Sequence, residues 1–219
     1  MLGILRDGGP MAWVLLLASV AAAVVFFERL LYLHRAQIKT GDFLRGIFTI
    51  LRRQNRVEAI AICDETPGPV ARVIRAAILH MDGSPAEVRH AIRESALAEI
   101  PRIERHVGVL GVIAQTAPLL GLLGTVLGMM QMFLTLQQKA PLIHAGDLGA
   151  GLWTALIATA AGLSVAIASH VGYSFLVGRV ESLALDMEHA ALEMIAFIRN
   201  AGSENTNLAV HEHAKPTGV

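Results

Sequence analysis

Residues 107–138 read VGVLGVIAQTAPLLGLLGTVLGMMQMFLTLQQ and contain no Asp, Glu, Lys or Arg. An α-helix needs roughly 20 apolar residues to cross the hydrocarbon core of a bilayer, which is about 30 Å thick. Two further intervals, Gly8–Phe27 and Leu148–Gly178, also lack these four residue types. The chain therefore has three segments long enough to span a membrane. The second and third are longer than the core requires, so we expect them to extend beyond it.

The composition of the whole chain is typical of a membrane protein. Of its 219 residues, 54% are hydrophobic and 16% are charged, whereas a soluble domain carries about 25% charged residues. Lys+Arg and Asp+Glu are equal at 18 each, so no net positive charge attracts nucleic acid. The single cysteine, Cys63, cannot form an internal disulfide and is too few for a structural zinc site. We therefore expect a protein surrounded by membrane lipids, with no nucleic-acid partner, metal or cofactor.

Positive residues are concentrated in the connection between the first and second segments. Positions 34–106 carry twelve Lys or Arg, whereas the connection at 139–147 carries only Lys139. The positive-inside rule places the basic connection in the cytoplasm, with the N-terminus in the periplasm and the C-terminus in the cytoplasm. The first segment has most of its flanking positive charge after it, so we expect a retained anchor; a cleaved signal peptide is the alternative.

Apolar residues also recur at helical spacing outside the three segments. In the basic connection this spacing predicts helices at 42–54, 57–64 and 69–81. Ser84 and Glu87 form a capping box that should begin a longer helix running toward the second segment. After the third segment an apolar stripe continues from Val180 to Ile198, and we expect it to pack against other helices of the same assembly.

The predicted fold is all-α: a three-span membrane protein whose long second and third helices extend into a cytoplasmic helical stem. We expect a periplasmic N-terminus with the first membrane helix (1–33), a cytoplasmic helical loop (34–106), the second membrane helix (107–138), a short periplasmic loop (139–147), the third membrane helix (148–178), its cytoplasmic extension (179–202) and a disordered tail (203–219).

Small residues recur every three or four positions in the second and third segments. Lipid tails give membrane helices no hydrophobic reason to associate, so close approach through small residues has to supply the packing. The predicted packing residues are Gly121, Gly124, Gly128, Ala155, Gly162 and Ala166. Pro118 has no backbone N–H and predicts a kink in the second helix.

The polar residues of these two segments are mainly hydroxyls and amides. A membrane threonine often bonds only the carbonyl one turn back, so packing is the simplest interpretation of each one. Two facing sets of hydroxyls could instead order water along a proton path. The intervals contain no carboxylate, and their only histidine, His170, is expected near the membrane interface. If protons cross here, we expect another chain to supply the acid.

Two stretches resemble the second-span and third-span motifs of the MotA/TolQ/ExbB proton-channel family. They are APLLGLLGTVLGM at 117–129 and ALIATAAGL at 155–163, and FERLLYL at 27–33 is similar to the end of the family's first span. The resemblance implies an inner-membrane motor subunit of the ExbB or TolQ type. Five copies would form a ring around an ExbD- or TolR-like single-span partner whose intramembrane Asp accepts protons. The energy would reach a TonB- or TolA-like protein that serves the outer membrane.

The resemblance also assigns roles to three threonines. Thr125 and Thr159 match the family's pore-lining threonines, whereas Thr154 stands where ExbB and TolQ types usually have a glutamate. This departure leaves open the choice between ExbB-like and TolQ-like, and the ion, H⁺ or Na⁺, is open as well.

Two other classes of function compete with the motor subunit. A membrane scaffold of the same architecture without ion flux is supported by the missing glutamate. An intramembrane protease would have to use Ser164 or Ser169 with His170. Adjacent residues of a helix point to different faces, so Ser169 and His170 are poorly placed to act together, and we expect no enzyme.

Overall fold

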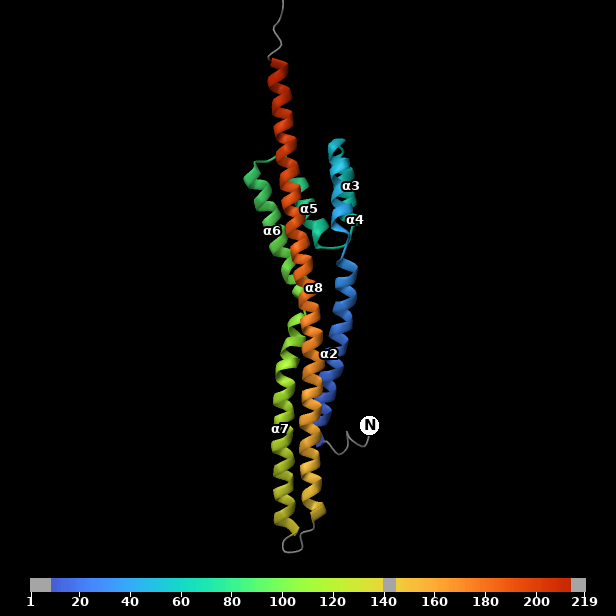
Figure 1. The fold of residues 1–219 in the computed structure, drawn as a ribbon, viewed down its shortest axis with the longest axis vertical. Helices are drawn as coiled ribbons and strands as arrows, with labels where there is room; N and C mark the ends of the chain where they lie inside the picture. The colour runs from blue at the N-terminus through green and yellow to red at the C-terminus, as the bar shows by residue number, and fades with distance from the viewer. Residues whose placement is uncertain (1–8, 140–144, 214–219) are drawn as a thin grey trace, which may run out of the picture. The chain divides into compact units, whose positions relative to one another are not determined.

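The computed structural model describes residues 9–139 and 145–213, and all regular secondary structure in them is helical. Its helices are α2 (Gly9–Ala36), α3 (Thr40–Arg52), α4 (Arg56–Glu65), α5 (Pro69–Leu79), α6 (Pro85–Glu104), α7 (Val107–Lys139) and α8 (Ala145–His213) (Figure 1). The helices α2, α7 and α8 each contain a segment long and apolar enough to cross a membrane. The predicted all-α, three-span fold is therefore confirmed.

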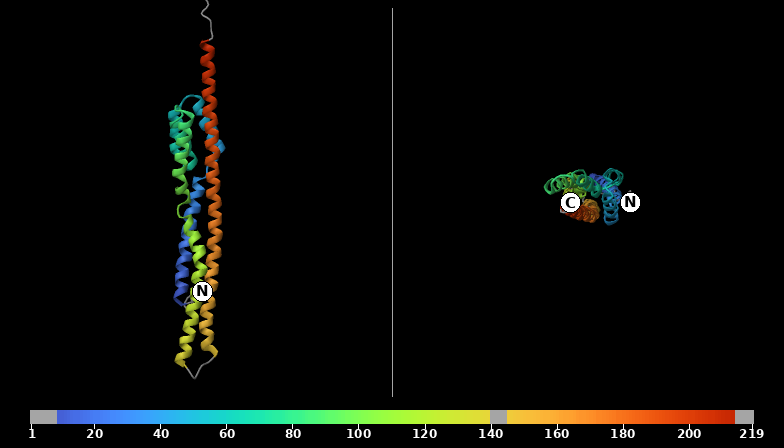
Figure 2. Two further views of the ribbon diagram at one scale, coloured as in Figure 1. Left: turned by 90° about the vertical axis from the view of Figure 1, so that its left-hand side faces the viewer. Right: turned by 90° about the horizontal axis from the view of Figure 1, so that it is seen from above.

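The described residues divide into two compact units. The first, called the membrane unit below, comprises 9–31 and 105–178, and the second, called the loop unit, comprises 32–104 and 179–213. In the membrane unit, α7 and the first part of α8 run side by side, and α2 lies against them (Figures 1 and 2). A small cluster in which Leu15, Ala117 and Ala166 are buried joins the three helices.

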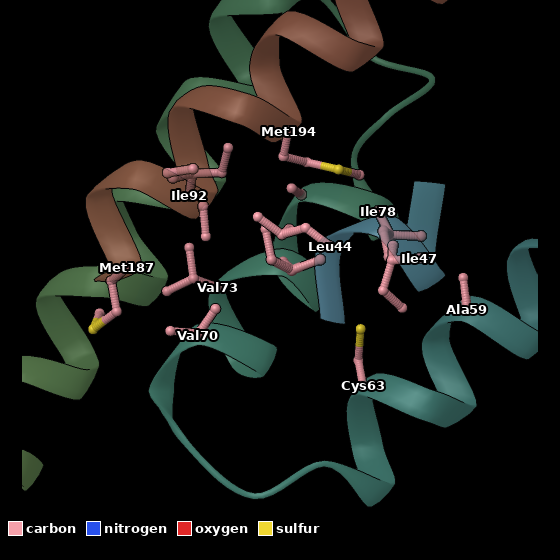
Figure 3. Close-up of a cluster of buried hydrophobic side chains, with 14 of the residues drawn as sticks. Leu44, Ile47, Ala59, Cys63, Val70, Val73, Ile78, Ile92, Met187 and Met194 are labelled. Atoms are coloured by element: carbon pink, nitrogen blue, oxygen red, sulfur yellow. The ribbon is translucent and has the colours of Figure 1, made fainter. Parts of the chain in front are cut away.

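The loop unit has a larger apolar core, built from α3 to α6 and the later part of α8. Figure 3 shows Leu44, Val73 and Ile92 converging with Met187 and Met194 of α8. Met187 is 3% exposed and Met194 is fully buried. The apolar stripe of 180–198 therefore has the predicted phase, and the helices that it packs against include those of its own chain.

Local chemistry sets the helix boundaries in the loop unit. The backbone N–H of Glu87 donates to Ser84 Oγ at 3.2 Å, and the Ser84 N–H donates to Glu87 Oε2 at 3.1 Å, which confirms the capping box. Before α5, Gly68 adopts a φ of 120°, and a Cβ there would lie 2.6 Å from the carbonyl oxygen of Ala36. Only glycine fits this approach between the end of α2 and the start of α5.

One helix boundary agrees with the sequence expectation, and another differs from it. The helix that begins at Pro85 ends at Glu104 and α7 begins anew at Val107, because His106 between them has a φ of 63°. This left-handed conformation interrupts a continuous helix. At the other end, α8 continues beyond Gly202 to His213, so 203–213 are helical, whereas 214–219 lie outside the described residues. Part of the expected periplasmic loop, 140–144, also lies outside them.

The reactivity of Cys63 provides a test of the packing of the loop unit. Its side chain is buried in the core, and burial, followed by the charge of Asp64, raises the pKa of the thiol to about 11. The thiolate is the reactive form, so at pH 8 we expect maleimide labelling about 100-fold slower than for an exposed cysteine, rising toward pH 11. The control is Val57→Cys, at an 80% exposed position, in a Cys63→Ala background. Equal labelling rates at pH 8 would contradict this packing.

The same pKa shift has a consequence for stability. The folded chain holds the thiol proton more tightly than the unfolded chain does. The protonated thiol therefore contributes to the free energy of unfolding, and this contribution is fully present below the ordinary thiol pKa. It is lost as the pH rises toward about 11.

Candidate functional site

Two glycines face each other where α7 and α8 pack closely together. A Cβ on Gly162 would lie 2.7 Å from the carbonyl oxygen of Ala117 and 2.8 Å from the Cα of Gly121. A Cβ on Gly121 would lie 3.1 Å from the carbonyl oxygen of Ala158. The obstructing atoms are backbone, which cannot rotate away as a side chain can. The contact has no room for a Cβ at Gly162 and little room at Gly121, and it sets the spacing of the two helix axes.

The other predicted packing residues lie along the same contact. A Cβ on Gly124 would collide with the Ala158 methyl, and a Cβ on Gly128 would lie 3.0 Å from the backbone nitrogen of Ala155. Ala155 and Ala166 are 3% and 8% exposed. The small residues of the two helices thus bury one another within one chain, and they do not need a second copy for this purpose.

Thr125 and Thr159 lie close to this contact. The Cα of Thr159 is 3.4 Å from the position that a Gly121 Cβ would take, and Thr125 follows Gly121 by one turn of α7. Both side chains are half-buried. The Thr125 hydroxyl donates to the carbonyl of Leu122 at 2.6 Å, and the Thr159 hydroxyl donates to that of Ala155 at 3.4 Å. Each hydroxyl oxygen keeps lone pairs that can accept a hydrogen bond.

Thr154 lies on a different face of α8. Thr159 follows it by five positions, which corresponds to a rotation of about 140° around the helix. A Cβ on Gly9 would lie 3.7 Å from its methyl group, so Thr154 is close to the start of α2. Its hydroxyl donates to the carbonyl of Ala150 at 3.1 Å. The structure thus brings Thr125 and Thr159 together and leaves Thr154 apart from them.

Pro118 lies inside α7, and the helix continues across it. Its missing N–H leaves the carbonyl one turn back without its usual backbone donor. The kink itself stays a prediction.

A buried charged group at the end of the first span was not found from the sequence. The Arg29 side chain is 5% exposed, and its Nη2 donates to Nδ1 of His106 at 3.0 Å. Glu28 completes the cluster: its Oε1 lies 3.6 Å from Arg29 Nη2 and its Oε2 lies 3.6 Å from His106 Nδ1. Because a guanidinium only donates, Nδ1 must accept, and the imidazole carries its proton on Nε2 in this arrangement.

This cluster joins residues 77 positions apart, and its His106 has the left-handed conformation at the point where α6 gives way to α7. Charged residues directly after a membrane segment usually mark only its end, and no local pattern connects Arg29 with His106. The available signal was the charged pair Glu28 and Arg29 within the FERL stretch.

We predict that Arg29→Ala destabilises the membrane unit. It removes a buried charged donor and its hydrogen bond to the exposed His106 side chain, which contributes about 1.5–3 kcal/mol, and the thermal midpoint in detergent should fall by several degrees. His106→Asn should stay near wild type, because asparagine tolerates the left-handed region and its amide oxygen can accept from Arg29. His106→Gly keeps the backbone freedom and removes the acceptor, so it should resemble Arg29→Ala. An unchanged midpoint for Arg29→Ala would show that the cluster does not stabilise the fold.

Among the described residues, no three His, Cys, Asp or Glu side chains gather closely enough to hold a metal ion.

Comparison with known proteins identifies the family of this chain. The sequence matches the profile of the MotA/TolQ/ExbB proton channel family over residues 65–189. The chain belongs to the MotA/TolQ/ExbB family. It is similar to an ExbB homolog of Methanothermobacter thermautotrophicus, with 27% identity over 198 residues that cover 90% of this chain and 68% of the relative. It is also similar to ExbB-like protein 3 of Synechocystis, with 32% identity over 164 residues that cover 74% of this chain and 78% of that protein.

A TolQ relative shows that the similarity extends to both named types. The Tol-Pal system protein TolQ of Haemophilus influenzae is 35% identical over 116 residues, which cover 48% of this chain and 47% of TolQ. As a MotA/TolQ/ExbB protein with three apolar helices, the chain is a multi-pass membrane subunit of the kind found in energising systems. This family is a transport-associated proton-channel family.

Proposed function

We propose that the chain is the ring-forming subunit of a motor driven by the proton motive force, of the ExbB or TolQ type. It would lie in the bacterial inner membrane with its N-terminus in the periplasm and its C-terminus in the cytoplasm. The ring, which we expect to be a pentamer, would surround an ExbD- or TolR-like single-span protein. Proton flow would energise a TonB- or TolA-like protein for outer-membrane transport or maintenance.

The observation that carries this proposal is the position of Thr125 and Thr159 beside the glycine contact of two helices whose apolar spans contain no acid. Residues 107–138 and 148–178 have no Asp or Glu. A hydroxyl can pass a hydrogen-bonded proton but does not release one in the physiological pH range. A proton route lined by these threonines therefore needs a carboxylate from another chain, which fits a partner that brings an intramembrane Asp.

The ring has separate support from the outer surface of the membrane unit. Large apolar side chains of α7 and α8 are more than half exposed in the single chain; they include Leu119, Leu122, Phe133, Leu156, Ile167 and Val171. In a membrane such side chains face lipid or other helices. Because α7 and α8 bury each other's small residues, the contacts between copies would be made by these larger side chains.

Thr154 has a secondary place in this proposal. Thr154 is rotated around α8 away from the threonine pair and lies beside the start of α2. We therefore assign it to the edge of the proton route. The subunit would lack a carboxylate station at this position.

A membrane scaffold of the same architecture remains the second candidate. The hydroxyls of Thr125 and Thr159 both donate to carbonyls of their own helices. That geometry suits a packing role as well as a role in proton transfer.

The deciding experiment is proton flux in liposomes. The chain is co-purified with a single-span protein from the same genome that carries an intramembrane Asp, and the complex is reconstituted with a pH-sensitive dye inside. We expect acidification under an imposed membrane potential and pH gradient in sodium-free buffer. The matched control is the same complex with the partner's Asp changed to Asn, which should conduct no protons.

The outcomes separate the two candidates. A wild-type complex that assembles but carries no protons would favour the scaffold. Flux that appears only with sodium would show that the transported ion is Na⁺. Native mass spectrometry of the same preparation gives the number of copies. A folded chain that is purely monomeric would contradict the ring.

A further inference from the structure

A hollow between α7 and α8 lies away from the threonine pair, toward the end of the spans where α7 begins. It has a volume of about 360 Å³ and is lined by Gly111, Ala114, Gln115, Ala166, His170 and Tyr173, with Ile167 and Val171 at its side. Small residues form its floor, and three side chains with hydrogen-bonding groups surround it. A volume of this size holds several water molecules, since each occupies about 30 Å³ in the liquid.

The glycine in the floor is what leaves room for the tyrosine ring. A Cβ on Gly111 would lie 3.2 Å from Cε2 of Tyr173 and 3.4 Å from its Cδ2. The ring therefore rests directly on the α7 backbone. Gln115 and His170 are both exposed in the single chain, and they border the hollow from α7 and α8.

The hollow lies on the same helix faces as the two threonines. His170 follows Thr159 by 11 residues, about three turns, so the two side chains point in directions only about 20° apart. Ala114 precedes Thr125 by the same interval on α7 and lines the hollow. The threonine pair and the hollow thus occupy successive levels of one groove between the two helices.

His170 differs in kind from every other polar side chain on this face. A histidine gains and loses a proton between pH 5 and 8, which no hydroxyl or amide does. Tyr173 is the other titratable side chain that lines the hollow. The packed parts of both helices, 107–138 and 148–178, carry no Asp, Glu, Lys or Arg. Across this hollow, therefore, no fixed charge of α7 or α8 faces the imidazole.

We propose that this hollow is a water-filled vestibule in which His170 relays protons between the threonine pair and the membrane surface. The proposal rests on the proposed function, and it adds a proton-accepting residue on this subunit. Gln115 and Tyr173 would order the water beside the imidazole. His170 would then be the titratable station that the subunit has in place of a carboxylate.

The relay step needs only water and the imidazole. A hydronium ion in the hollow gives its proton to the unprotonated ring nitrogen, so an O–H bond breaks, an N–H bond forms and the ring becomes positive. The opposite ring nitrogen then releases its proton to water on the other side, and the neutral ring remains. One proton enters and one leaves, and no oxidant or other co-reactant is consumed.

The test uses the reconstituted complex with its partner and measures proton flux at a fixed membrane potential from pH 5 to 8. His170→Gln keeps a hydrogen-bonding side chain but cannot titrate, so we expect flux to fall about 100-fold and its pH dependence over this range to flatten. Gln115→Leu and Tyr173→Phe should lower flux while keeping the pH dependence. The matched control is Ser164→Ala, which removes a hydroxyl that donates to the carbonyl of Ala160 on another face of α8.

A second measurement reports water in the hollow without any flux. In a Cys63→Ala background, Gln115→Cys should react with a membrane-impermeant thiosulfonate, and Thr116→Cys, on the neighbouring face, should react at least several-fold more slowly. Native mass spectrometry checks that each variant assembles. A His170→Gln complex with the wild-type flux and pH profile would overturn the relay while leaving the proposed function intact. Equal reactivity of the two cysteines would overturn the vestibule. Absence of flux in the wild-type complex would instead count against the proposed function.

Discussion

Thr125→Val and Thr159→Val should each abolish most proton flux while the assembly survives. Valine keeps the shape of threonine but has no hydroxyl. The water or acid that donates a hydrogen bond to this hydroxyl therefore loses its acceptor, in a medium of low dielectric constant. The lost hydrogen bond costs about 1–3 kcal/mol, which corresponds to roughly a 5- to 150-fold fall in rate. The flux assay with the partner subunit measures this directly, and native mass spectrometry reports whether the ring remains.

The chain offers matched controls for both threonines. Thr116 lies nine residues from Thr125, on the opposite face of α7, and its hydroxyl donates to its own helix at 2.8 Å. Thr116→Val therefore removes the same group with the same backbone contact, and it should leave flux unchanged. For Thr159 the corresponding control is Ser164→Ala. Wild-type flux from both Thr125→Val and Thr159→Val would assign these residues to packing alone.

Much of the fold follows from patterns that are local in the sequence. Charge-free intervals place the three apolar helices, and the Ser84–Glu87 box fixes the start of α6 because both of its hydrogen bonds are made within one turn. The apolar stripe after the third span gives the correct phase, since a helix that packs on one side must repeat with its own period. These features depend on spacing alone.

The features that could not be predicted all depend on contacts between distant residues. The hydrogen bond from Arg29 to His106 joins the end of the first span to the break between α6 and α7, and no local pattern in the sequence connects these two residues. Likewise, the small-residue stripes could have packed against another copy as well as against each other. Periodicity shows that a face is made for close contact, but it does not identify the surface that meets it.

The candidate site shows the same limit. The motif similarity pointed to Thr125, Thr159 and Thr154 together, whereas helix geometry separates Thr154 from the other two by about 140°. His170 was expected to be an interfacial residue because of its place near the end of the span. Its position three turns beyond Thr159 is visible in the sequence, but the hollow that it borders requires Gly111 and Ala114 of the other helix.

The glycine contact should be the least tolerant position of the membrane unit. Gly162→Ala places a methyl group 2.7 Å from one backbone atom and 2.8 Å from another, so α7 and α8 must move apart. Overpacking of this kind costs about 1–3 kcal/mol, and Gly162→Leu should prevent stable folding of the unit. We expect a lower thermal midpoint in detergent for Gly162→Ala and loss of the assembled species in gel filtration for Gly162→Leu.

Gly178 provides the control, because it lies on the same helix and a Cβ there would meet nothing within 4 Å. Alanine at such a site restricts the unfolded chain and favours the helix by roughly 0.5–1 kcal/mol. The same substitution should therefore raise the midpoint at Gly178 and lower it at Gly162. The opposite signs separate the close approach of the two helices from the general effect of removing a glycine. If both variants shifted the midpoint in the same direction, the glycine contact would not be what holds α7 and α8 at this spacing.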